Sequence, residues 1–149
     1  MVSSFKELGG RMLVIFDGRC GFCNRSVRWF LTRDRQDRLR FAPSELAQVA
    51  GILTRHGFSA SDAATDPGTI LVVRDPGGPL EQIWVRSDAV VALLHELPRP
   101  WPVVGSALRW VPRDVRDLGY RFIARWRYCI WGRLKSCPVP TPEEQARFL

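Results

Sequence analysis

The apolar residues of the chain fall into short runs and periodic stretches that predict alternating strands and helices. Residues Met12–Phe16 form an unbroken apolar run, which is typical of a strand buried on both faces of a sheet. From Cys20 to about Arg33 the apolar side chains recur every three or four positions, the spacing of an amphipathic helix. The alternating segment Leu39–Ala42 predicts a short second strand.

The middle of the chain predicts a helix, a loop and a β-hairpin. Ser44–Leu53 has a helical pattern with Ser44 as its N-cap, and Gly57–Gly68 is rich in the small and polar residues of loops. Thr69–Val73 and Gln82–Val85 flank a Pro-Gly-Gly turn, which favours two antiparallel strands.

The remaining segments are helical. Ser87 and Asp88 predict an N-cap for a helix over Ala89–Leu97, and two further helices are expected over Val104–Trp110 and Arg113–Tyr128. The order β, α, β, α, β, β, α predicts an α/β protein, a thioredoxin-like mixed sheet flanked by helices with an additional helical C-terminal extension. We expect one domain over residues 1–149, with its core at about 11–97 and the extension at about 98–149.

Composition and length agree with one globular domain. The chain has 149 residues, of which 46% are hydrophobic and 25% charged, enough to bury a core without a metal or disulfide scaffold. The first ten residues are mixed and polar, and no apolar run approaches the length of a membrane span. A cytoplasmic location is therefore predicted, where a close cysteine pair is more often catalytic or metal-binding than structural.

Positive charge is concentrated near the C-terminus. The net charge is +7, and residues 109–135 contain eight Arg or Lys and two Asp. Tryptophans accompany this basic segment at Trp101, Trp110, Trp126 and Trp131. Such a combination occurs on membrane-surface helices and on nucleic-acid surfaces. However, Leu118, Phe122 and Trp126 repeat every four residues, which favours a helix packed on the sheet. We therefore expect no nucleic-acid partner, and we favour core packing over peripheral membrane contact.

Cys20 and Cys23 carry the clearest chemical signal. They follow the predicted first strand and open the first helix, so both sulfurs lie within one helical turn. The first thiol would lie at the positive end of the helix dipole, beside unpaired backbone N–H groups, and both favour the reactive thiolate. This arrangement predicts a redox dithiol in which Cys20 attacks a disulfide and Cys23 resolves the mixed disulfide. A zinc-stabilised binding module and a redox-inert one with a basic C-terminal surface are the alternatives.

Several segments of the chain resemble the DCC-type thiol–disulfide oxidoreductases. They are Phe16–Asn24, Arg86–Ala89, Val111–Tyr120 and the tail from Arg125 through Gly132 to Cys137, in the order and spacing of that family. The resemblance extends from about Met12 to Pro138. It implies a thioredoxin-like fold and a redox role for the first cysteine pair. Cys129 departs from the family pattern, which has another residue at that position.

Residues around the dithiol are candidates for proton transfer and substrate contact. Asp17 lies three residues before Cys20 and could accept a proton as Cys23 becomes nucleophilic, or could simply bond the turn. Arg19 would add positive charge beside the first sulfur. Gly21 and Phe22 fill the positions between the cysteines and are expected to contact substrate.

Other candidates are distant from the dithiol in the sequence. Ser87 and Asp88 follow the hairpin, as do the residues that hold the γ-glutamyl end of glutathione in related folds, but capping of the next helix is the favoured explanation. Cys129 and Cys137 are possible accessory thiols. We expect no cofactor and no metal, and the expected partner is a disulfide-containing protein or a glutathione-like thiol.

Overall fold

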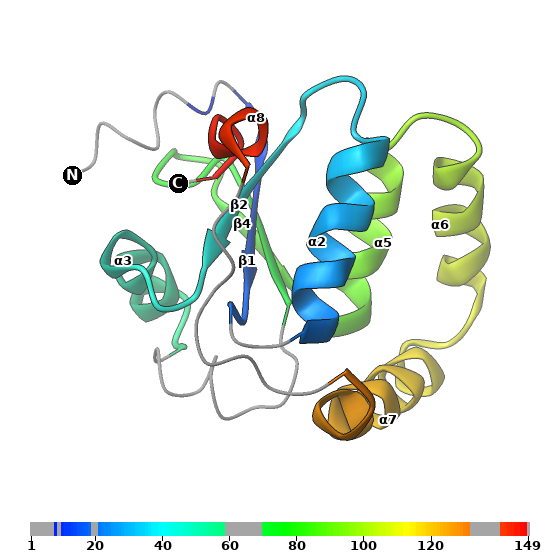
Figure 1. Cartoon of the computed structure of the whole chain (residues 1–149). Coiled ribbons are helices and arrows are strands. Elements are labelled where there is room, and N and C mark those ends of the chain that lie inside the picture. The colour runs from blue at the N-terminus through cyan, green and yellow to red at the C-terminus, as the bar shows by residue number, and fades with distance from the viewer. Residues whose placement is uncertain (1–7, 9, 19–20, 59–69, 132–140, 149) are drawn as a thin grey trace.

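The computed structural model describes residues 8, 10–18, 21–58, 70–131 and 141–148 (Figure 1). Its centre is a four-stranded mixed sheet with the order β2-β1-β3-β4. Strand β1 (Met12–Phe16) pairs in parallel with β2 (Leu39–Pro43) and antiparallel with β3 (Leu71–Arg74). Strand β4 (Gln82–Val85) completes the hairpin with β3 and forms one edge.

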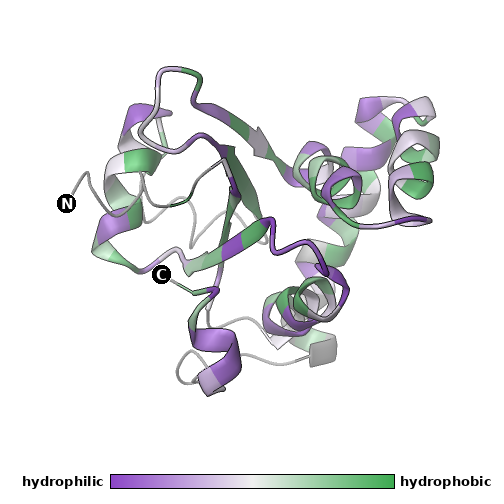
Figure 2. Cartoon of the chain, turned by 90° about the horizontal axis from the view of Figure 1, so that it is seen from above, coloured by the Kyte–Doolittle hydropathy of each residue, from purple (hydrophilic) through white to green (hydrophobic). Residues whose placement is uncertain are grey.

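Helices cover both faces of this sheet. Figure 2, seen from above, shows the largely hydrophobic strands between two groups of helices. The helices are α2 (Gly21–Arg33), α3 (Ala47–Arg55), α5 (Arg86–Glu96), α6 (Trp101–Trp110), α7 (Arg113–Trp131) and α8 (Pro142–Gln145). Helices α2 and α5 pack on one face, α3 packs on the other, and α6 packs outside α5.

The alternation of side chains along β1 builds two hydrophobic cores. All five of its residues are buried, and successive side chains point to opposite faces. Met12, Val14 and Phe16 face α2 and α5, whereas Leu13 and Ile15 face α3. Burial on both faces explains why the sequence of β1 is continuously apolar.

The predicted fold class is confirmed: the sheet and its flanking helices are consistent with a thioredoxin-like arrangement. The predicted N-cap at Ser44 is wrong, because α3 begins at Ala47 after Leu46. Ser44 is buried, and its backbone N–H donates to the Phe16 carbonyl at 2.8 Å, so it still belongs to the edge of the sheet. Most of the predicted loop and the start of the predicted third strand lie outside the described residues.

The C-terminal segment returns to the opposite edge of the sheet. Phe148 forms a parallel bridge with Phe41 of β2, and its ring packs against Phe16 and Phe41. Arg147 donates to the Leu31 and Asp34 carbonyls and lies 3.5 Å from the buried Asp34 carboxylate. The end of the chain thereby fixes the junction between α2 and β2.

Helix α7 does not pack as its apolar spacing predicts. Leu118, Phe122 and Trp126 are exposed to 68%, 66% and 47%, so the predicted packing of these residues on the sheet is wrong. The helix lies across one end of α2 and α5 and contacts both (Figure 1). Polar side chains on its opposite face attach it to α5.

Candidate functional site

The turn between β1 and α2 positions the predicted dithiol. Asp17, which directly follows β1, is buried, as is Gly18. Helix α2 then begins at Gly21, and Cys23 lies half-buried in its first turn, against the hydrophobic core on the α5 side. Arg19 and Cys20 lie outside the described residues, as does the side chain of Phe22. Asp17 thus lies at the end of the buried strand β1, and Cys23 lies in the first turn of α2.

Asn24 stabilises this turn. Its side-chain Nδ2 donates to the Gly18 carbonyl at 2.9 Å and so joins α2 to the segment that precedes it. No acidic residue lies in the first turn of α2, whose backbone N–H groups form the positive end of the helix dipole. A thiol at this end would be favoured as thiolate. We did not predict a role for Asn24, although it follows Cys23 within the motif.

Ser87 and Asp88 do not cap α5. That helix begins at Arg86 and makes no side-chain capping bond, so the capping prediction is wrong. Instead the Ser87 hydroxyl donates to the Asp117 carboxylate of α7. Asp88 forms ion pairs with Arg113 at 3.0 Å and Arg116 at 3.2 Å. Both residues therefore join α5 to α7.

Two further bonds complete this attachment. The Ile70 N–H donates to the Tyr120 hydroxyl at 2.9 Å, which ties α7 to the start of β3. The Arg116 Nε donates to the Val111 carbonyl, which holds its guanidinium beside Asp88. The Ser87 hydroxyl and nearby guanidinium groups lower the pKa of Asp117, because both stabilise its charged form. The two motif segments 86–89 and 111–120 are thus one structural unit.

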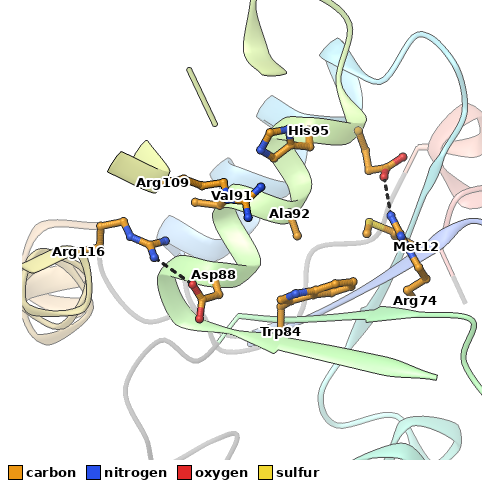
Figure 3. A pocket seen from close by; sticks show the side chains of 10 residues that line it. Met12, Arg74, Trp84, Asp88, Val91, Ala92, His95, Arg109 and Arg116 are labelled. Atoms are coloured by element: carbon orange, nitrogen blue, oxygen red, sulfur yellow. Dashed lines mark hydrogen bonds and ion pairs between the residues drawn. The ribbon is translucent and has the colours of Figure 1, made fainter. Parts of the chain in front are cut away.

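A cavity of about 670 Å³ lies beside this attachment (Figure 3). Its acidic side chains are already paired, Asp88 with Arg116 and Glu96 with Arg74. Cys23 is not among the lining residues, which are Met12, Arg74, Trp84, Asp88, Val91, Ala92, His95, Glu96, Arg109 and Arg116. Of the described residues in the cysteine motif, Cys23 therefore does not line the cavity.

The two C-terminal cysteines bear on the zinc hypothesis, because cysteines would supply the zinc ligands. Cys129 lies exposed near the end of α7, and Cys137 lies outside the described residues. Within the described part of the chain, no three Cys, His, Asp or Glu side chains form a group suited to a metal ion. Cys20 and Cys137 lie outside the described residues, so a zinc site that includes them stays a hypothesis.

Comparison with known proteins agrees with this architecture. Residues 14–133 match the model of the DCC1-like thiol-disulfide oxidoreductase family. A chloroplastic DCC family protein of Arabidopsis thaliana is 30% identical over 92% of this chain and 74% of its own. The uncharacterized protein YuxK of Bacillus subtilis is 29% identical over 97% of both chains.

No solved structure matches the chain significantly. Among the described helices, none combines the length and the apolar character that crossing a membrane requires. The family match spans the β1–α2 unit, the hairpin, α5 and the whole of α7. The chain therefore belongs to the DCC1-like thiol–disulfide oxidoreductase family.

Proposed function

We propose that the protein is a thiol–disulfide oxidoreductase whose dithiol is Cys20 and Cys23. The observation that supports this most strongly is the position of Cys23, half-buried in the first turn of a helix that directly follows a buried central strand. In the sequence, Cys20 directly precedes Gly21, the first residue of that helix. The family match covers the same segment.

The proposed reaction transfers two electrons from the dithiol to a substrate disulfide. The Cys20 thiolate attacks one sulfur of the substrate, an S–S bond breaks, and the first substrate thiolate leaves. Cys23, as thiolate, then attacks the sulfur of Cys20 and releases the second substrate thiolate. The protein is left with a Cys20–Cys23 disulfide, and an external thiol must reduce it before the next cycle.

Neighbouring residues would support both steps. Asp17 is buried just after β1, and we assign its carboxyl group the role of taking the proton of Cys23 before the second attack. Arg19 would stabilise the Cys20 thiolate by its charge. We assign Gly21 and Phe22 to substrate contact because they separate the two sulfurs along the chain.

A disulfide-containing protein fits this site better than a glutathione-like thiol. Recognition of glutathione by Asp88 would need its carboxylate to bind an amine, but two guanidinium groups already surround that carboxylate. Ser87 is likewise bonded to Asp117. Turnover as a reductase needs a thiol donor, which the cytoplasm supplies, and no bound cofactor.

Insulin reduction with dithiothreitol as electron donor tests this function. We expect Cys20→Ser to abolish turnover, and Cys23→Ser to trap a mixed disulfide on Cys20 that mass spectrometry detects. Cys129→Ser is the matched control and should retain the wild-type rate. Full activity of Cys20→Ser, or stoichiometric zinc on the purified protein, would contradict the proposal and favour a binding module.

A further inference from the structure

Helix α7 presents an apolar face to the outside of the molecule. Successive residues of a helix are rotated by about 100°, so Val115, Leu118, Phe122 and Trp126 fall within a sector of about 80°. We call these four residues the α7 apolar stripe. All four are exposed, with Val115 at 56%, and the rings of Phe122 and Trp126 are 6.4 Å apart. A contiguous exposed apolar face of this kind marks an interaction surface.

The outward direction of the stripe is fixed by the opposite face of the helix. Arg113 and Arg116 bind Asp88, and Asp117 accepts from Ser87. Tyr120 accepts from the backbone N–H of Ile70, just before β3. Rotating α7 to bury the stripe would break all of these bonds at once. The fold therefore keeps the stripe exposed to solvent.

Charge beside the stripe indicates what it binds. Arg121 and Arg125 are exposed on the same side as Leu118, and neither forms an ion pair with a described residue. The surrounding segment 109–135 has eight basic and two acidic residues. A partner must therefore offer both an apolar interior and negative charge, which an anionic lipid surface combines.

Other partners fit these features less well. A nucleic acid would satisfy the arginines but leave the side chains of Leu118 and Phe122 unburied. A second copy of the chain would bring an equally basic surface against this one, and like charges repel. Trp126 also suits a bilayer, because indole rings favour the boundary between headgroups and acyl chains.

We propose that the α7 apolar stripe docks the protein on anionic membranes, with α7 lying in the plane of the interface. Docking does not depend on the redox function. If both hold, the first turn of α2, which lies beside α7, is held close to the lipid surface, so the disulfides it meets are those of membrane-bound or membrane-adjacent proteins (Figure 1).

Sedimentation of the full chain with lipid vesicles tests the proposal. We expect binding to vesicles that contain phosphatidylglycerol, weaker binding to phosphatidylcholine alone, and loss of binding in high salt. The double variant Leu118→Gln with Phe122→Gln should weaken binding by about tenfold or more. Arg121→Gln with Arg125→Gln should weaken only the binding that depends on anionic lipid.

Leu80→Gln is the matched control, because Leu80 is 74% exposed in the turn between β3 and β4, on a different element. It should bind vesicles as the wild type does. Circular dichroism should show all variants folded, since every substituted side chain is exposed. Absence of binding to anionic vesicles, or binding that survives the double variant, would overturn the proposal. So would a dimer in sedimentation velocity that the double variant dissociates, because the stripe would then be a dimer interface.

Discussion

The Ser87 hydroxyl donates a hydrogen bond to the Asp117 carboxylate, thirty residues away in the sequence, and so joins α5 to α7. Asp88 adds ion pairs to Arg113 and Arg116 at the same place. The motif residues in this part of the chain therefore have a structural role that the sequence alone does not reveal. They hold α7 across one end of α2.

Removing this bond should destabilise the protein. Ser87 is buried, so Ser87→Ala leaves a carboxylate oxygen without its donor, and we expect a loss of about 1–3 kcal/mol. Urea unfolding measures the change, and Ser106→Ala on the exposed side of α6 is the control. An unchanged unfolding midpoint for Ser87→Ala would show that the bond contributes nothing to the attachment of α7.

Asp34 is the most deeply buried acidic residue among the described ones, exposed to only 1%. Its carboxylate accepts from the Arg38 and Leu39 N–H groups and pairs with Arg147. Asp34→Ala should therefore cost about 3 kcal/mol, because it leaves two backbone N–H groups without their acceptor and removes one of the two carboxylates that pair with Arg147. Chemical denaturation should detect this loss, whereas the exposed Asp114→Ala should change stability by less than about 0.5 kcal/mol. Equal effects of the two substitutions would contradict this role for Asp34.

Glu81 should make stability depend on acid pH. Burial raises the pKa of this carboxyl group, but hydrogen bonds from Arg55, the Gly77 N–H and His56 outweigh it and lower the pKa from 4.5 to about 2. The unfolded chain therefore binds more protons in acid. The stabilisation is full above about pH 5 and is lost as pH falls toward 2.

Glu81→Gln tests this linkage, since its amide does not titrate between pH 2 and pH 5. After allowance for solvent screening, we expect the variant to lose about 1–2 kcal/mol at pH 7 and to show a shallower fall in stability below pH 5. Glu45→Gln, on an exposed position, should keep the wild-type slope. A slope for Glu81→Gln as steep as that of the wild type would contradict the assigned pKa.

Two helical glycines should respond to alanine with opposite signs. A Cβ at Gly105 would lie 3.2 Å from the Leu94 Cβ, where α6 packs closely on α5, so Gly105→Ala should lose about 1 kcal/mol or more. A Cβ at Gly51 would meet only the end of the Arg55 side chain at 3.8 Å. Gly51→Ala should therefore gain about 0.5–1 kcal/mol from helix propensity. Thermal unfolding compares the two, and stabilisation by both would show that the α5–α6 contact tolerates a methyl group.

Local sequence patterns predict correctly those elements whose apolar residues are the ones buried in the fold. The continuous apolar run of Met12–Phe16 specifies a central strand, and the observed bounds are the same. The periodicity after Cys20 likewise predicts α2, because its apolar side faces the sheet. In both cases the pattern and the final burial agree.

Other features depend on contacts between distant residues. The spacing of Leu118, Phe122 and Trp126 shows that α7 is amphipathic but does not say which face turns inward. Asp117 and Tyr120 fix that direction through hydrogen bonds to Ser87 of α5 and to Ile70, just before β3. Because these partners lie far apart in the sequence, no local signal could have found them.

The redox state of Cys20 and Cys23 tests the central proposal most directly. Equilibration in glutathione buffers, followed by alkylation and peptide mass spectrometry, measures how each cysteine pairs. We predict a reversible Cys20–Cys23 disulfide with a potential between about −270 and −120 mV, the range of known oxidoreductases. Cysteines that never pair with one another in these buffers, or that bound zinc shields from alkylation, would contradict the oxidoreductase proposal.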